Sequence, residues 1–362
     1  MNELPLEGVR VLEVAPGYAA GFAGRLLAGF GADVAVAGDP SAELTPDELV
    51  FLTSGKRRVT GASPGDLRRL ALAADIVLDD QKPGTLASVG LAPDGLRREN
   101  PALIVVSITP FGQRGPYADW GATNITAFSM GGIVSLTGHP SREPLVTGGS
   151  QAYALGGLNA FSATVTAYYG RLVHGEGDWI DISLQECSAG MLELYGPGSA
   201  ATDVGPSPRR GNHVRAVWGI YPCADGWAGV CCLERQVPAF FKLLDDPVLE
   251  EERFRDPFQR AEQDDELSAM VYAWFADKTK AEILALGPKT RVPFGAVMTP
   301  GDLLANESLA ERGFFDAVPT PDGEARIPGR PFPGVLWRAP QLHDSEDAES
   351  LLRDWSAERV RA

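Results

Sequence analysis

One segment of the sequence combines the glycines of a catalytic turn with the apolar residues of a buried helix. It reads LVTGGSQAYALGGLNAFSATVTAYYGRL, from Leu145 to Leu172, and it contains no acid, histidine or cysteine. Tyr153 is the chemically useful side chain on its first turn. Because a phenol has a pKa of about 10, it is a poor nucleophile at neutral pH, but it can donate a hydrogen bond or act as a general acid. The alternative is a cleft in which Tyr153 only fills space.

The charge of the chain limits its partners. Lys and Arg total 32 against 48 Asp and Glu, which gives a formal net charge of −16. Such a field repels nucleic acid and anionic membranes, so we expect neither as a partner, and a local basic cluster must meet any anionic ligand. The sequence has no apolar run of about 18 residues that could cross a bilayer. Its acidic start is unlike a signal peptide, which favours a cytoplasmic location.

The cysteines and histidines do not form a metal-binding pattern. The four cysteines include no CxxC, and the four histidines are scattered. We therefore expect neither a metal site nor a disulfide framework, and we interpret the cysteines as small core residues.

Strands and helices alternate through the first half of the chain. GVRVLEVAP (8–16) is typical of a buried strand, and an apolar helix, a glycine stop and a second strand at Asp33–Val36 follow it. Further helix–strand pairs lead to ALIVVSITP (102–110). This order predicts an open, parallel α/β sheet with right-handed crossovers.

The second half of the chain begins with a candidate domain boundary. This is a loop rich in Pro, Gly and Ser at Gly196–Gly211. Beyond it, GIYPCADGWAGVCCL predicts a β-hairpin with Asp225 and Gly226 in its turn.

The first strand–helix junction argues against one common enzyme class. PGYAAGFAG places Gly17, Gly21 and Gly24 at GxxxGxxG spacing. A dinucleotide site needs GxGxxG, whose close glycines form the tight turn and admit the pyrophosphate. The glycines therefore indicate a helix packed closely on the sheet, and they disfavour a nicotinamide dehydrogenase.

Several longer segments resemble the family III CoA-transferases, the superfamily of formyl-CoA transferase, the carnitine CoA-transferases and the 2-methylacyl-CoA racemases. The similarity begins in LEGVRVLEVAPGYAAGFAGRLLAGFGADV and continues in KPGTLASVGLAPDGLRRENPALIVVSITPFGQRGPYADW. It returns in GDWIDISLQE, GNHVRAVWGIYPCADGWAGV and RVPFGAVMTPGDLLANESLAERGFF, and so covers nearly the whole chain.

The resemblance implies a particular architecture. A large Rossmann-like domain would be built from both ends of the chain, residues 1–205 and 315–362, with a smaller α+β domain, residues 206–314, inserted between them. The family's members form homodimers in which the two chains interlock like linked rings. Some members are heteromers, so pairing with a paralogue is a second possibility.

The resemblance also implies a catalytic position. In the transferases an aspartate attacks the CoA thioester and forms an acyl anhydride, then an aspartyl-CoA thioester. Aligned on Gly148, Gly157 and the helix that contains GLNA, that aspartate falls on Tyr153. Gly148 and Gly149 would lie at the substrate. Tyrosine cannot form the anhydride, but it can donate a hydrogen bond to a thioester or enolate oxygen.

A racemase activity matches less well. The racemases exchange the α-proton of the acyl group with a His/Asp pair and a glutamate. The segment that should hold the histidine, WGATNITAFSMGG, has Ala122, Thr123 and Asn124 instead, and we retain Asn124 as a substrate contact. Glu234 in VCCLERQ matches the glutamate. It is either a general base or a solvated acid at the end of a strand.

The substrate implied by the resemblance is CoA or acyl-CoA, whose phosphates need cations. Lys56 and Arg57 in TSGKRRV and Lys82 in DDQKPG match basic positions of the family near the nucleotide. Exposed surface charge is the alternative for Lys56 and Arg57. The second strand has Val36 and Gly38 where the family typically has Lys and Glu, which weakens the case for CoA.

A further basic cluster, RRGNHVR (209–215), matches a GN motif that the family has near the substrate. Asn212 and His213 either contact the acyl group or order the linker between the domains.

Three functions remain open. The chain is an enzyme that transfers CoA between carboxylic acids, or does related thioester chemistry, on a small-molecule acyl substrate. It is alternatively an inactive acyl-CoA-binding subunit that pairs with an active paralogue, or its cleft serves chemistry without CoA. We favour the first.

Overall fold

The computed structural model of the protein describes residues 4–192, 209, 211–320 and 323–359. The chain forms two compact units. The large unit contains Met1–Ser135, Val146–Pro206 and Glu307–Ala362, and the small unit contains Leu136–Leu145 and Ser207–Asn306. The sequence placed the second junction at 314/315, whereas here the large unit resumes at Glu307. The predicted boundary loop, Gly196–Gly211, lies outside the described residues except for Arg209 and Gly211.

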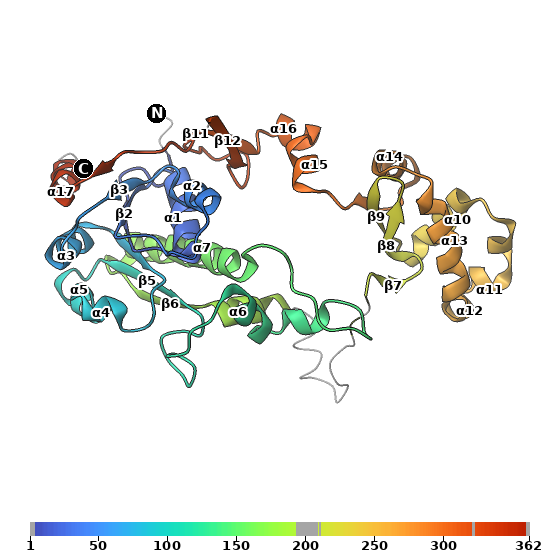
Figure 1. Cartoon of the computed structure of the whole chain (residues 1–362), viewed down its shortest axis with the longest axis horizontal. Coiled ribbons are helices and arrows are strands. Elements are labelled where there is room, and N and C mark those ends of the chain that lie inside the picture. Colours follow the sequence, from blue (N-terminus) through green and yellow to red (C-terminus); the bar gives the residue numbers. More distant parts are fainter. Residues whose placement is uncertain (1–3, 193–208, 210, 321–322, 360–362) are drawn as a thin grey trace. The chain divides into compact units, whose positions relative to one another are not determined.

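A seven-stranded sheet forms the centre of the large unit (Figure 1). Its strand order is β13-β3-β2-β1-β4-β5-β6, and every neighbouring pair is parallel. The predicted parallel α/β sheet is confirmed. The strands are β1 (Arg10–Val14), β2 (Asp33–Ala37), β3 (Arg57–Val59), β4 (Ile76–Asp79), β5 (Ile104–Thr109), β6 (Trp179–Ser183) and β13 (Ser345–Glu346).

Both faces of this sheet are buried, because successive side chains of a strand point to opposite faces. Val11 on β1 and Val106 on β5 belong to one hydrophobic core. Their neighbours Leu12 and Val105 belong to the core on the other face. The described helices of the large unit are α1 (Tyr18–Gly29), α2 (Pro46–Thr53), α3 (Pro64–Ala73), α4 (Thr85–Ser88), α5 (Pro93–Glu99), α6 (Asn124–Met130), α7 (Gln151–His174), α8 (Leu184–Ala189), α16 (Glu307–Glu311) and α17 (Ala348–Arg359).

The helices α1 and α7 cover one face of the sheet and pack closely together. A Cβ on Gly157 of α7 would lie 2.6 Å from the backbone oxygen of Ala19 on α1. The helices α3, α4, α5 and α17 contribute to the core on the opposite face. Figure 1 shows α17, at the red end of the chain, beside α3.

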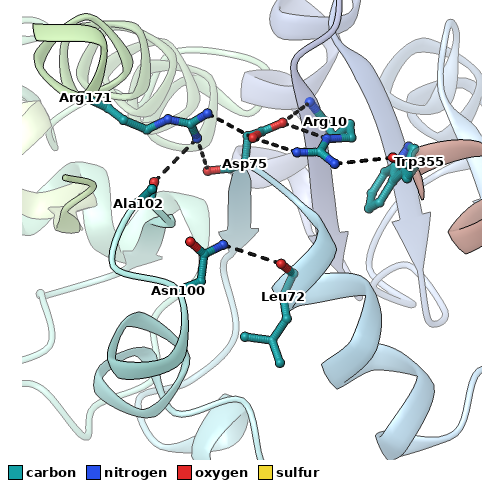
Figure 2. Close-up of polar contacts among 7 residues, drawn as sticks. All are labelled: Arg10, Leu72, Asp75, Asn100, Ala102, Arg171 and Trp355. Atoms are coloured by element: carbon teal, nitrogen blue, oxygen red, sulfur yellow. Dashed lines mark hydrogen bonds and ion pairs between the residues drawn. The ribbon is translucent and has the colours of Figure 1, made fainter. Parts of the chain in front are cut away.

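A buried charge network joins four of these elements (Figure 2). The guanidinium of Arg10 donates to both carboxylate oxygens of Asp75, at 2.9 and 2.8 Å, and Nη1 of Arg10 reaches the carbonyl of Trp355 on α17. Arg171, in the last turn of α7, donates to Oδ1 of Asp75 at 2.9 Å. These bonds tie β1, β4, α7 and α17 together at the edge where β1 and β4 begin.

The small unit has its own sheet and core. Its sheet has the antiparallel order β10-β9-β8-β7, with β7 (His213–Arg215), β8 (Trp218–Cys223), β9 (Gly226–Cys231) and β10 (Phe294–Ala296). Cys223 pairs with Gly226, so the hairpin turns on Ala224 and Asp225, and Gly226 already belongs to β9. The described helices of this unit are α10 (Val237–Leu244), α11 (Glu252–Arg255), α12 (Pro257–Glu262), α13 (Asp264–Ala276), α14 (Lys280–Thr290) and α15 (Pro300–Leu304).

A second, two-stranded sheet lies in the last segment of the large unit. It pairs β11 (Phe315–Thr320) with β12 (Gly323–Pro328) antiparallel. None of the described helices combines the length and the apolar character needed to cross a membrane.

Candidate active site

A cavity of about 400 Å³ opens at the carboxyl ends of the parallel strands of the large unit. The segments that follow β1, β2, β4 and β5 line it, together with the first turn of α7. In the sheet, β2 lies on one side of β1 and β4 lies on the other. The cavity therefore lies at the point where the strand order reverses. Ligands of open α/β sheets bind at such a point.

Tyr153 lies in this cavity, on the first turn of α7. Its ring is half-buried and stacks on that of Tyr18 from α1, with 6.4 Å between the ring centroids. Burial raises the pKa of the Tyr153 phenol, and the charges of Glu43 and Asp80 raise it further. The phenol therefore stays protonated at neutral pH, and it can donate a hydrogen bond from its hydroxyl.

The segment before α7 is held by a single amide. Asn124, the first residue of α6, accepts from the backbone N–H of Ala152 at 2.9 Å and donates to the carbonyl of Gly149 at 3.2 Å. Gly149 has φ +76°, which suits glycine, and the carbonyl of Gly148 accepts from the side chain of Gln151. The structure thus brings Asn124, Gly148 and Gly149 together beside Tyr153, where they order the start of α7.

A carboxylate fills the amino end of α1. Asp80, directly after β4, accepts from the backbone N–H groups of Gly17 at 2.6 Å and Ala20 at 3.0 Å. A Cβ at residue 17 would lie 2.8 Å from this carboxylate, so glycine is needed for the close approach. Burial raises the pKa of Asp80, while the two N–H donors lower it. The helix end, which could otherwise attract a ligand's anion, is therefore occupied by the protein's own carboxylate.

Lys56 lies outside the cavity. The residue is 1% exposed, and its ammonium donates to Oε1 of Glu13 at 2.6 Å and to the carbonyl of Gly21 at 2.7 Å. Burial raises the pKa of Glu13 to about 7, against the attraction of Lys56. Neither reading of Lys56 from the sequence, a phosphate ligand or an exposed surface charge, describes this buried ion pair below α1.

Arg57 and Lys82 have different surroundings. Arg57 forms ion pairs with Glu346, Asp33 and Asp354, and so ties the C-terminal segment to the sheet. Lys82, which follows Asp80 and Gln81, lines the cavity with an exposed side chain. It is the one cation among the described residues that line this cavity.

The remaining candidates lie in the small unit. Glu234 forms an ion pair with Arg260 at 2.5 Å, and its side chain is 49% exposed. Asn212 and His213 line a separate cavity of about 470 Å³ on the small sheet. His213 packs against the rings of Tyr221 and Tyr272, and burial lowers its pKa, which keeps the imidazole neutral. Within the part of the chain that the structure describes, Nε2 of His213 is buried and has no hydrogen-bond partner.

Sequence reasoning missed several side chains of the Tyr153 cavity. Tyr18 and Trp120 contribute aromatic rings to it, and Asp39, Glu43 and Glu48 contribute carboxylates. All but Trp120 lie in the segments after β1 and β2. The rule that loops after parallel strands line the site could have found them, had the second strand been followed into its loop.

Comparisons with known proteins agree with this fold. The model of CoA-transferase family III matches residues 6–344. The succinyl-CoA–D-citramalate CoA-transferase of Chloroflexus aurantiacus is 30% identical, over 96% of this chain and 94% of its own. The beta subunit of succinyl-CoA–L-malate CoA-transferase from the same organism is 30% identical, over 90% of this chain and 86% of its own. A crystal structure of a CAIB/BAIF family protein from Brucella suis covers 98% of this chain and 99% of its own, with a TM-score of 0.85 and 28% identity. The chain described here belongs to CoA-transferase family III.

Proposed function

We propose that this protein transfers CoA between carboxylic acids in the cavity around Tyr153. The reaction is R–CO–SCoA + R′–COO⁻ → R–COO⁻ + R′–CO–SCoA. The phenol of Tyr153 donates a hydrogen bond to the thioester oxygen as negative charge develops on it. The observation that carries the proposal is the position of this protonated phenol at the carboxyl end of the sheet.

The reaction needs no nucleophile from the protein. The acceptor's carboxylate oxygen bonds to the thioester carbon, and the C–S bond breaks to release the CoA thiolate and a mixed anhydride. The thiolate then bonds to the acceptor-derived carbonyl carbon, and the donor acid leaves as its carboxylate. Each step conserves charge and transfers no proton, so the phenol is required only as a donor.

Another carboxylate in the cavity is less suited to attack. Both oxygens of Asp80 accept backbone N–H groups of α1, and an attack on a thioester would break at least one of these bonds. We therefore assign Asp80 to holding the turn between β1 and α1. Lys82 is our candidate partner for the CoA phosphates, because Lys56 and Arg57 are engaged by carboxylates.

We further propose that the protein acts as a dimer. The helix α7 exposes Leu158, Val165, Tyr169 and Leu172, spaced to lie along one helical face. A second copy of the chain would cover this face, in an interlocked homodimer. A heteromer with an aspartate-bearing paralogue is the second candidate, favoured by Tyr153 itself and by the relative named as a beta subunit.

Calorimetric titration with CoA and acetyl-CoA, followed by a transfer assay, tests the proposal. The assay offers acyl-CoA donors and carboxylate acceptors and detects new thioesters by mass spectrometry. We expect both CoA species to bind, Lys82→Ala to weaken binding, and Lys289→Ala, an exposed lysine of the small unit, to leave it unchanged. If neither CoA species binds the purified chain, the proposed function is wrong. Transfer only after a paralogue is added would favour the heteromer.

A further inference from the structure

The side chains around the Tyr153 cavity carry net negative charge, whereas a site that binds anionic acids would carry net positive charge. Four carboxylates line it, those of Asp39, Glu43, Glu48 and Asp80, against the single ammonium of Lys82. A second negative charge on the substrate's acyl group would therefore meet net repulsion here.

Two of these carboxylates already have partners. Asp80 accepts the N–H groups of α1, and Glu48 caps α2 at Thr45 and accepts from Ser150. The side chains of Asp39 and Glu43 are exposed at the cavity, and no hydrogen bond or ion pair joins either carboxylate to another described residue. Glu43 lines the same cavity as Tyr153. It is thus a free anion beside the group that we propose as the donor to the thioester.

Aromatic rings complete the lining. Tyr18 and Tyr153 stack on each other, and Trp120, which is 53% exposed, lines the same cavity. The faces of such rings attract ammonium groups, and neighbouring carboxylates strengthen the attraction. Rings and acids together therefore line the cavity in which we place the thioester.

Resting on the proposed function, we infer that the acyl group handled in this cavity carries an ammonium group. This sets the chain apart from the relatives named for succinyl-CoA, citramalate and malate, all of which are dicarboxylic acids or their thioesters. Glu43, with Asp39, determines the specificity by attracting the cation and repelling a distal carboxylate.

Three thioesters of matched shape test the inference. β-Alanyl-CoA, butyryl-CoA and succinyl-CoA share the chain X–CH₂–CH₂–CO and differ in X, which is an ammonium, a methyl or a carboxylate group. We expect kcat/KM, and affinity by calorimetry, to fall in that order, with β-alanyl-CoA favoured over succinyl-CoA by about tenfold or more. Succinyl-CoA equal to or better than β-alanyl-CoA would overturn the inference.

A charge reversal with a matched control makes the test specific. Glu43→Lys should reverse the order, so that succinyl-CoA becomes the better substrate. Glu176→Lys makes the same change in net charge at an exposed residue outside the cavity, and it should preserve the order. If Glu43→Lys leaves the order intact, Glu43 does not select the acyl group.

Binding of small fragments separates this inference from the proposed function. Saturation-transfer NMR with n-butylammonium and with butyrate needs no CoA. One outcome is that no thioester binds, while butylammonium binds the wild type and does not bind Glu43→Lys. In that case the proposed function is wrong and the preference for cations is supported. If thioesters bind but butyrate matches butylammonium, the preference for cations fails alone.

Discussion

The ring of Tyr153 stacks on the ring of Tyr18, with the two planes 27° apart, so two phenols from different helices meet in one cavity. Burial raises the pKa of both. Both hydroxyls are consequently protonated at neutral pH, and only their positions distinguish them. The two residues therefore offer a matched pair of Tyr→Phe substitutions that differ in a single hydroxyl at each site.

Tyr153→Phe removes the proposed donor to the thioester oxygen and keeps the ring. We expect kcat to fall by about 10²-fold, as for other lost donors of this kind, with KM nearly unchanged. Steady-state kinetics of CoA transfer measure both parameters. Tyr18→Phe is the control and should change kcat less than about threefold. An unchanged kcat in Tyr153→Phe would show that the hydroxyl does not take part in the reaction and that Tyr153 only fills space.

Lys56→Met should destabilise the protein rather than weaken CoA binding specifically. The substitution leaves Glu13 buried without its cation, which costs about 3–5 kcal/mol in other proteins. Thermal unfolding should show the loss, and the double variant Glu13→Gln/Lys56→Met should recover much of it. Arg58→Met, two residues away and exposed, is the control. A stable Lys56→Met variant that no longer binds CoA would contradict the structural role.

Gly157→Ala should also destabilise the large unit. The new methyl would approach the carbonyl of Ala19 to 2.6 Å and force α7 away from α1, at a cost of about 1–3 kcal/mol. Gly170→Ala changes the same helix where nothing lies within 4 Å of the added Cβ. There alanine should stabilise by roughly 0.5–1 kcal/mol, because it favours helix more than glycine does. Opposite shifts in unfolding temperature are the expected outcome, and equal shifts would refute close packing.

Asp79→Asn should change how stability depends on pH. Burial raises the pKa of Asp79 from 3.8 to about 7, so the folded state holds its proton more tightly than the unfolded chain does. The stability that this provides is complete below about pH 4 and is lost as the pH rises through 7. Asn keeps the oxygen that accepts from the N–H of Gln81 and cannot ionise. The stability gained by the variant should therefore be larger at pH 8 than at pH 5, by up to about 3 kcal/mol.

The unfolding temperatures of the wild type and of Asp79→Asn at pH 5 and pH 8 measure this difference. Asp47→Asn, at an exposed carboxylate of α2, serves as the control. If Asp79→Asn gains no stability at pH 8, ionisation of the buried Asp79 carboxyl group does not destabilise the folded protein.

The sequence predicts the sheet well because its signals are local. Apolar runs mark β1, β2, β4 and β5, and prolines and glycines separate them from the helices. It misses the short strand β3, whose sequence RRV has little apolar periodicity. Instead β3 is held from both sides, by β2 and by β13 from the far end of the chain. No local pattern encodes such pairing between distant segments.

In the candidate site, too, some features follow from the local sequence and others only from contacts between distant segments. Alignment on its neighbours located Tyr153, and the structure places it in a cavity. The environment of Lys56 could not be found in this way, since its partner Glu13 lies 43 residues earlier and both sit among apolar side chains. A lysine in a basic stretch looks exposed until the fold is known. Only the fold identifies which cation of TSGKRRV is buried.

The return of the chain to the large unit after the small one constrains how a newly made protein can fold. The ion pair of Arg57 with Glu346 and the burial of Trp355 both require the last segment. On the ribosome, the whole small unit is synthesised before that segment emerges. Until then the outer edge of the sheet at β3 has no neighbour, and the nascent chain presents an open strand to which chaperones or other chains can bind.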